Sequence, residues 1–187
     1  IEYSPEGLDF YYYRAIGLYQ LGMKEEALAT YRKATQQITS GSNTEMVSDI
    51  YTAMGDLYHE EGNPEQAYLC YDSALVYNPS NILVLNNYAY YLSLERKELD
   101  RAEEMSYRTV KAEPNNATYL DTYAWILFEK GNYAEARIYI DEAMKAEEGN
   151  QSDVVVEHCG DIYYMNGEHE KAIEYWQKAL ELGNESE

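Results

Sequence analysis

The clearest indication of the fold is in residues 51–79, which read YTAMGDLYHEEGNPEQAYLCYDSALVYNP. Gly55 is followed three residues later by Tyr58, and Ala67 is followed four residues later by Tyr71. Residues spaced by three or four positions share one face of a helix. Gly62, between the two segments, is suited to the left-handed conformation in which helices commonly end. The stretch therefore predicts two antiparallel helices joined by a tight turn.

The same pattern recurs along the chain. The alanine near the start of the second helix recurs at Ala27, Ala67, Ala102, Ala136 and Ala172, at intervals of 40, 35, 34 and 36 residues. A small residue precedes each turn at Ala15, Gly55, Ala89, Ala124 and Gly160. Repetition at such a period indicates a stack of similar units. It predicts five helix–turn–helix repeats over about residues 8–41, 48–81, 82–116, 117–150 and 153–186, forming one domain over residues 1–187.

The pattern resembles the tetratricopeptide repeat, a 34-residue helix–turn–helix unit. Tyr51, Gly55, Tyr58, Ala67 and Pro79 match that unit closely, and similar matches cover almost the whole chain. The third copy departs from the pattern, because Ser106 and Thr109 stand where an aromatic residue and an alanine are usual. The resemblance implies an all-α fold, a right-handed α-solenoid of about ten antiparallel helices. It also implies a bacterial source, and we expect the chain to be a fragment of a longer protein.

Composition limits the classes of protein to which the chain can belong. The 187 residues include 34 Asp and Glu against 14 Lys and Arg, which gives a net charge of −20. That charge argues against nucleic acid as a partner, because phosphates would be repelled. No run reaches the roughly 18–20 apolar residues of a membrane span. The hydrophobic share of 45% is that of an ordinary folded protein.

Catalytic motifs are not found in the sequence. It contains no phosphate-binding glycine loop, nucleophile elbow or zinc-protease helix. His59 with Glu60 and Glu61 is typical of a solvated helix end rather than a divalent-ion site. His158 and Cys159 are adjacent, so on a helix their side chains point about 100° apart and cannot easily share a metal. We therefore predict no enzyme activity, no cofactor and no metal, and we expect Cys70 and Cys159 to be buried thiols.

Tyrosine is unusually frequent, with 22 copies beside only 2 Phe and 2 Trp. Part of this excess falls at repeat positions that normally hold large core residues. These positions are Tyr11, Tyr31, Tyr51, Tyr58, Tyr71, Tyr88, Tyr123 and Tyr163. They are expected to pack in the core with the hydroxyl near the surface or a helix end.

Beside these core positions, a stripe of residues runs along the first helix of each repeat. The family resemblance implies that these helices line a concave groove that binds peptides. The predicted groove residues are Tyr12, Ile16, Tyr19, Thr52, Asp56, His59, Asn86, Asn87, Tyr90, Asp121, Trp125, Phe128, Glu157, Asp161 and Tyr164, with Thr122 and His158 flanking them. The stripe is aromatic and acidic and contains no lysine or arginine. The alternative, that these residues simply pack against the next repeat, stays open here.

The function predicted from these features is that of a non-catalytic protein–protein interaction module. Its groove would hold an extended or helical segment that is neutral to basic and carries apolar anchors. Two alternatives remain: a scaffold that self-associates or bridges subunits of an assembly, and an accessory region of a multidomain protein. The sequence leaves open the bacterial cytoplasm and the periplasm or cell envelope as the compartment.

Overall fold

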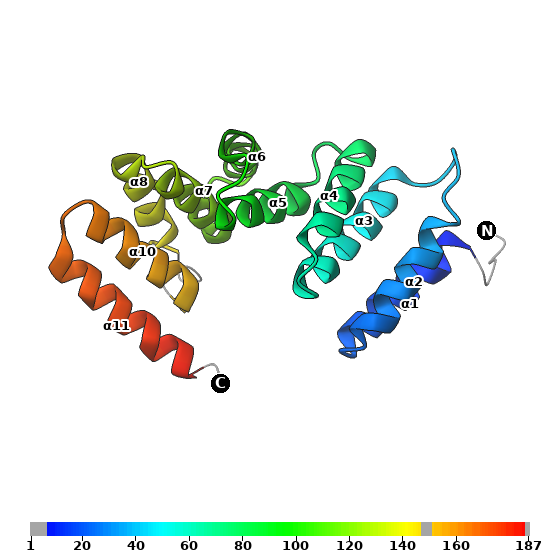
Figure 1. Ribbon diagram of the computed structural model, residues 1–187, viewed down its shortest axis with the longest axis horizontal. Helices are drawn as coiled ribbons and strands as arrows, with labels where there is room; N and C mark the ends of the chain where they lie inside the picture. The colour runs from blue at the N-terminus through cyan, green and yellow to red at the C-terminus, as the bar shows by residue number, and fades with distance from the viewer. Residues whose placement is uncertain (1–6, 147–150, 186–187) are drawn as a thin grey trace. The chain divides into compact units, whose positions relative to one another are not determined.

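The computed structural model describes residues 7–146 and 151–185, which form ten α-helices and no β-strand (Figure 1). The chain divides into two compact units, residues 1–84 and 85–187. Each unit is described by itself below. The prediction of a single domain over residues 1–187 stays a prediction.

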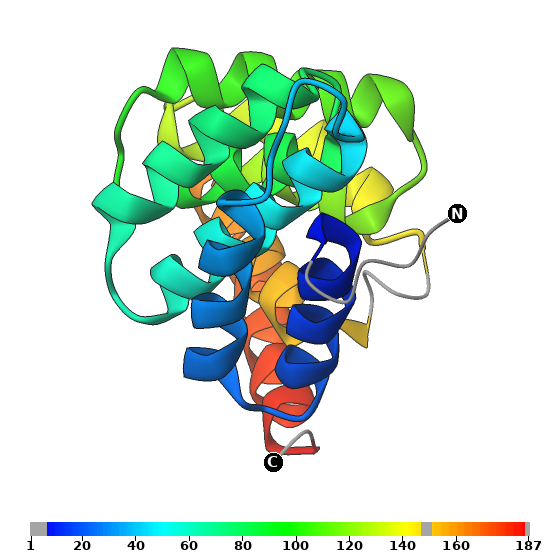
Figure 2. The ribbon, with the colours of Figure 1, turned by 90° about the vertical axis from the view of Figure 1, so that its right-hand side faces the viewer.

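The first unit consists of two helix pairs. Its helices are α1 (Leu8–Gln20), α2 (Lys24–Thr35), α3 (Thr44–Glu60) and α4 (Pro64–Tyr77). Helix α1 packs along α2, and α3 packs along α4, each pair antiparallel (Figure 2, where α1 and α2 are blue). Helix α2 also contacts α3, so the two pairs lie against one another. The two helix pairs predicted for the first two repeats are present.

The second unit continues the pattern. Its helices are α5 (Ile82–Leu94, whose first turn belongs to the first unit), α6 (Leu99–Ala112), α7 (Ala117–Glu129), α8 (Tyr133–Ala143), α10 (Asp153–Met165) and α11 (His169–Glu185). Helix α7 packs on α6 and α8, and α10 packs on α7, α8 and α11. Within this unit the helix pairs described here therefore contact the next pair in the sequence, as repeats do in repeat proteins.

The turns inside four repeats depend on a glycine with positive φ, between 75° and 83°, at Gly22, Gly62, Gly131 and Gly167. At Gly62 the chain reverses through two backbone hydrogen bonds, from Gly62 N to His59 O and from Asn63 N to Tyr58 O. The third repeat lacks this glycine. There Arg96 (φ 53°) and Glu98 (φ 43°) take the left-handed conformation instead. This conformation disfavours residues that carry a Cβ atom.

Close approach within two repeats depends on a glycine facing an aromatic ring. A Cβ atom added at Gly55 would lie 2.7 Å from Cδ1 of Tyr71. A Cβ atom added at Gly160 would lie 2.5 Å from both Cδ1 and Nε1 of Trp176. Both separations are shorter than van der Waals contact. The small residue before the turn therefore lets the two helices approach closely in these two repeats.

The predicted core tyrosines are mostly buried. Tyr31, Tyr58, Tyr71, Tyr88, Tyr123 and Tyr163 are each at most 7% exposed, whereas Tyr11 and Tyr51 are half-buried. Several of their hydroxyls reach charged groups, as expected for a buried phenol. Arg32 and Arg101 donate to the hydroxyls of Tyr58 and Tyr88, at 2.7 Å and 3.1 Å. The tyrosine excess is therefore in good part structural.

Candidate protein-interaction surface

In the first unit the predicted groove residues are largely engaged in packing. The Tyr12 hydroxyl donates to Asp49 Oδ2 at 3.4 Å, and the Tyr19 hydroxyl donates to Glu60 Oε1 at 3.5 Å. Both bonds join α1 to α3. Thr52 is buried, with its hydroxyl on the Ser48 carbonyl oxygen at 2.7 Å. In this unit Tyr12 and Tyr19 therefore connect consecutive repeats, whereas the Thr52 bond lies within α3.

The remaining predicted groove residues of this unit are also partly buried or hydrogen-bonded within the fold. The Asp56 carboxylate accepts the Tyr71 hydroxyl at 2.6 Å, so it holds the aromatic ring that crosses Gly55. Ile16 and His59 are half-buried. The peptide-binding role of these residues stays a prediction.

In the second unit four rings from three first helices form a cluster, which we call the aromatic cluster: Tyr90 on α5, Trp125 and Phe128 on α7, and His158 on α10. The Trp125 ring stacks on Phe128 at 4.8 Å between centroids and on His158 at 4.1 Å, with interplanar angles of 18° in both cases. Tyr90 lies 6.4 Å from His158. Consecutive repeats thus bring together rings that are far apart in the sequence.

A buried hydrogen-bonded pair supports this cluster. His158 Nδ1 and Asp121 Oδ1 are 2.9 Å apart, and the two residues are only 7% and 5% exposed. Removing either partner would leave a buried polar group unsatisfied, at a cost of roughly 1–3 kcal/mol. The sequence pattern predicts His158 only at the flank of the groove. The available signal was its position beside the stripe on the first helix of the fifth repeat.

Two buried polar atoms at this surface have no hydrogen-bond partner among the described residues: Nε1 of Trp125 and Oδ1 of Asn86. One is a donor and the other an acceptor. Asn86 is 6% exposed, and its amide nitrogen donates to Asn87 Oδ1 at a long 3.5 Å. Buried groups of this kind usually find a partner in the protein, in water or in a ligand.

The carboxylates of the predicted stripe have different environments. Asp161 accepts the Trp176 Nε1–H at 2.9 Å, so it holds the ring that crosses Gly160. Glu157 is exposed and has no hydrogen bond or ion pair among the described residues. Burial, together with the charges of Asp121 and Glu157, raises the pKa of the Tyr90 hydroxyl above its ordinary value.

The last predicted residue, Tyr164, is 48% exposed and packs against the rings of His169 and Trp176, at 4.6 Å and 5.7 Å. It therefore lies toward α11, the second helix of its own repeat. Together with Glu157, it is one of the more accessible members of the predicted stripe in the second unit.

Metal-binding clusters and membrane-spanning helices are not found among the described residues. Over residues 7–146 and 151–185, no group of three or more His, Cys, Asp or Glu side chains is arranged to hold a metal ion. Within the same residues, no helix has the length and apolar character needed to cross a bilayer. Cys70 and Cys159 are buried free thiols, as predicted, and burial raises the pKa of each.

Comparisons with known proteins agree with the repeat pattern. Models of the tetratricopeptide repeat match residues 48–81, 117–150 and 157–186. Type IV pilus assembly protein PilF of Pseudomonas aeruginosa is 25% identical over 186 residues, covering 97% of this chain and 69% of PilF. Anaphase-promoting complex subunit 8 of Dictyostelium discoideum is 33% identical over 85 residues. That match covers 46% of this chain but only 14% of the subunit.

Solved structures show the same fold. MamA from Desulfovibrio magneticus RS-1 has a TM-score of 0.74 at 17% identity, with 95% of this chain and 96% of that chain covered. A structure of Pseudomonas aeruginosa PilF has a TM-score of 0.72 at 22% identity, with 93% and 75% covered. These likenesses confirm the predicted all-α, α-solenoid fold class. The repeat matches and the stacked helix pairs together show that the chain belongs to the tetratricopeptide repeat family.

Proposed function

We propose that the second unit binds a segment of a partner protein on the first-helix surface, formed by α5, α7 and α10. The family supports a role in protein–protein interaction or scaffolding in general. The observation that carries the specific proposal is the aromatic cluster around Trp125, which stacks flat rings from two repeats at one place. Aromatic residues are enriched among the side chains that contribute most to binding at interfaces.

The unsatisfied polar atoms support the same surface. A bound segment carries backbone carbonyl and N–H groups, which are suited to pair with Trp125 Nε1 and Asn86 Oδ1. Both atoms are buried in the free protein, so small side-chain movements would accompany binding. Such rotamer changes are common at interfaces.

Charge defines the chemistry of the partner. Glu157 is exposed beside the aromatic cluster, and the chain carries a net charge of −20. A negative field enriches cationic segments and repels acidic ones. The partner segment is therefore neutral to basic and contributes apolar anchors to the rings.

The test is a peptide array in which net charge and apolar anchors vary independently, read at about 0.05 and 0.5 M salt. Basic peptides with apolar anchors should be captured, and less strongly at high salt. Trp125→Leu, which keeps apolar volume but removes the flat ring and the N–H, should weaken the hits about tenfold. The matched control is Tyr107→Leu on α6, because Tyr107 is a half-exposed aromatic residue outside this surface. Preferential capture of acidic peptides, or equal binding by the two variants, would contradict the proposal.

A second candidate function is scaffolding within a larger assembly. It is favoured by the names of two relatives, a type IV pilus assembly protein and a subunit of the anaphase-promoting complex. Sedimentation of the isolated chain distinguishes the two candidates. Reversible self-association that survives Trp125→Leu would favour the scaffold, whereas a monomer at all concentrations would favour binding of a partner segment.

A further inference from the structure

An open groove of about 700 Å³ lies between α10 and α11, and we call it the α10/α11 groove. Helix α10 contributes Asp153, Glu157 and Asp161, and α11 contributes Trp176, Ala179 and Leu180. Three carboxylates thus face an apolar floor. Among the described residues, no lysine or arginine lines the groove.

The preceding repeat shows how the chain itself fills the equivalent groove. The residues 36 positions earlier belong to α7 and α8, and the helix that packs against both of these is α10. At those positions Asp121, Ile140 and Ala143 are buried, at 5%, 0% and 0% exposure. A groove between the two helices of a repeat in this protein is therefore a docking place for a third helix.

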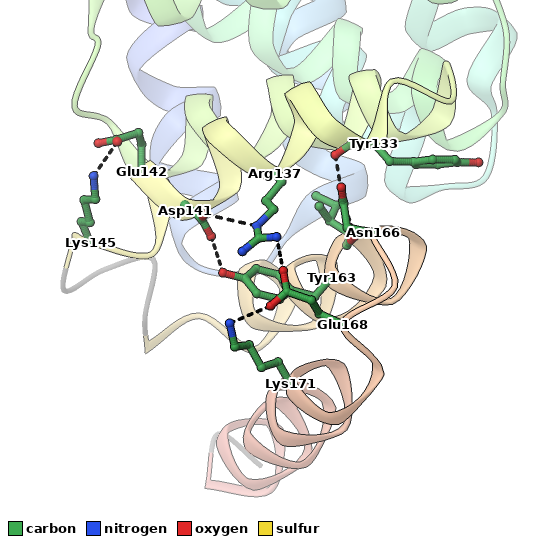
Figure 3. Close-up of polar contacts among 10 residues, drawn as sticks. Tyr133, Arg137, Asp141, Glu142, Lys145, Tyr163, Asn166, Glu168 and Lys171 are labelled. Carbon is green, nitrogen blue, oxygen red and sulfur yellow. Dashed lines mark hydrogen bonds and ion pairs between the residues drawn. The ribbon is translucent and has the colours of Figure 1, made fainter.

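The contacts of α10 in that place show what a docked helix provides. His158 reaches the Asp121 carboxylate at 2.9 Å. Figure 3 shows the other end of the junction, where the Tyr163 hydroxyl donates to Asp141 at 2.8 Å and the Arg137 guanidinium lies over the Tyr163 ring. Arg137 also pairs with Glu168 beyond α10. A nitrogen side chain opposite the buried acid, and a large ring that contacts Arg137 and Asp141 of α8, hold the helix.

The fifth repeat presents the same positions without such a helix among the described residues. Glu157 of the fifth repeat occupies the position that Asp121 has in the fourth repeat. Glu157 is exposed, whereas Asp121 is buried, with an exposed fraction of 5%. Leu180 occupies the position of Met144, and it is 69% exposed where Met144 is half-buried. An exposed apolar floor bordered by charge is typical of an interaction site.

We propose that the α10/α11 groove binds an amphipathic helix of a partner protein that carries a lysine or arginine opposite Glu157 and apolar residues against Trp176 and Leu180. The apolar floor accommodates a helix face, as the equivalent floor accommodates α10. The three carboxylates select a cationic helix, since like charges across an interface are strongly unfavourable. This site goes beyond the first-helix surface proposed above, because α11 takes no part in that surface.

The probe is a synthetic peptide of residues 152–165 of this chain, since α10 is a helix known to fit a groove of this kind. The peptide carries Asp153→Gln, Glu157→Gln, Asp161→Gln, Cys159→Ser and His158→Lys. Its control peptide differs only in having His158→Glu. Binding to the whole chain is measured by calorimetry, and the lysine peptide should bind about tenfold more tightly than the glutamate peptide.

Substitutions in the protein show where the lysine peptide binds. Glu157→Lys and Leu180→Ser should each weaken the lysine peptide about fivefold or more. The matched controls are Glu181→Lys and Ile173→Ser, which make the same changes at exposed positions of α11 outside the groove, and they should bind within about twofold of the parent. Trp125→Leu tests the first-helix surface independently, so failure of one proposal is distinguishable from failure of the other.

Three results would overturn the inference. The first is equal affinity for the two peptides, or no binding of either. The second is loss of binding in the Glu181→Lys control to the same extent as in Glu157→Lys, which would indicate attraction by net charge alone. The third is a dimer of the chain that Leu180→Ser dissociates, because the groove would then be covered by a second copy.

Discussion

Replacing Gly160 by alanine tests the packing of the fifth repeat with a single methyl group. The added Cβ atom would lie 2.5 Å from Cδ1 and Nε1 of Trp176, where van der Waals contact requires about 3.5–4.0 Å. The ring or the helix must therefore move by about 1 Å. Movement of the ring also stretches the 2.9 Å hydrogen bond from Trp176 Nε1 to Asp161.

The expected loss of unfolding free energy combines three effects. Overpacking a tight site costs about 1–3 kcal/mol. Weakening a hydrogen bond to a carboxylate costs up to about 1.5–3 kcal/mol. Replacing a glycine inside a helix by alanine stabilises the folded state by about 1 kcal/mol through helix propensity. We expect Gly160→Ala to lower the free energy of unfolding by about 2–3 kcal/mol.

Urea denaturation followed by tryptophan fluorescence measures this loss, because both tryptophans lie in the second unit. Gly183→Ala is the matched control on the opposite helix. The Cβ atom added there meets its nearest neighbour, Asp153 Oδ2, at an ordinary 3.6 Å. The control should leave the unfolding midpoint unchanged or slightly raised, since it adds helix propensity without overlap.

The fourth repeat provides a compensating change. It pairs Ala124 with Ile140 at the positions where the fifth repeat pairs Gly160 with Trp176. The cost of Gly160→Ala should therefore fall by about 1–2 kcal/mol when it is measured in a Trp176→Ile background. A midpoint raised by Gly160→Ala, as a plain helix-propensity change would give, or an equal cost in both backgrounds, would show that contact with the Trp176 ring does not limit stability.

Three further predictions concern thiols, tyrosines and a strained turn. Burial raises the pKa of Cys70 to about 11 and of Cys159 to about 12. Both thiols should therefore react with a thiol reagent at pH 8 at least about 100-fold more slowly in the native protein than in urea. Equal reaction rates in the two states would contradict their burial. Burial also raises the pKa of Tyr31 and Tyr123 to about 12, above the ordinary value near 10. The two tyrosines therefore contribute their full stabilisation below about pH 10 and lose it as the pH rises to about 12. Urea midpoints and absorbance at 295 nm should show this loss over the same pH range. A urea midpoint that stays constant across that range would contradict the prediction. Glu98→Gly should raise the free energy of unfolding by about 1 kcal/mol by relieving its left-handed backbone, and an unchanged or lower urea midpoint would refute this.

The repeat architecture of this protein can be predicted from its amino-acid sequence. The spacing of small and aromatic residues, as in Gly55 with Tyr71, located the helices and the turns. It succeeded because helix periodicity and the close approach of two adjacent helices are local properties, written within about 30 residues. The burial of the tyrosines at core positions followed from the same register.

Which side chains at the candidate surface are accessible and which are engaged depends on contacts between helices that the sequence does not specify. Asp56 and Asp161 looked like groove carboxylates, yet each holds the aromatic ring of a second helix, Tyr71 or Trp176. The bond between His158 and Asp121 spans 37 residues. Helix periodicity states which face a residue occupies, but contacts between repeats depend on how one helix pair is offset against the next. That offset is set by packing across the whole interface, so the aromatic cluster and the α10/α11 groove could be found only in three dimensions.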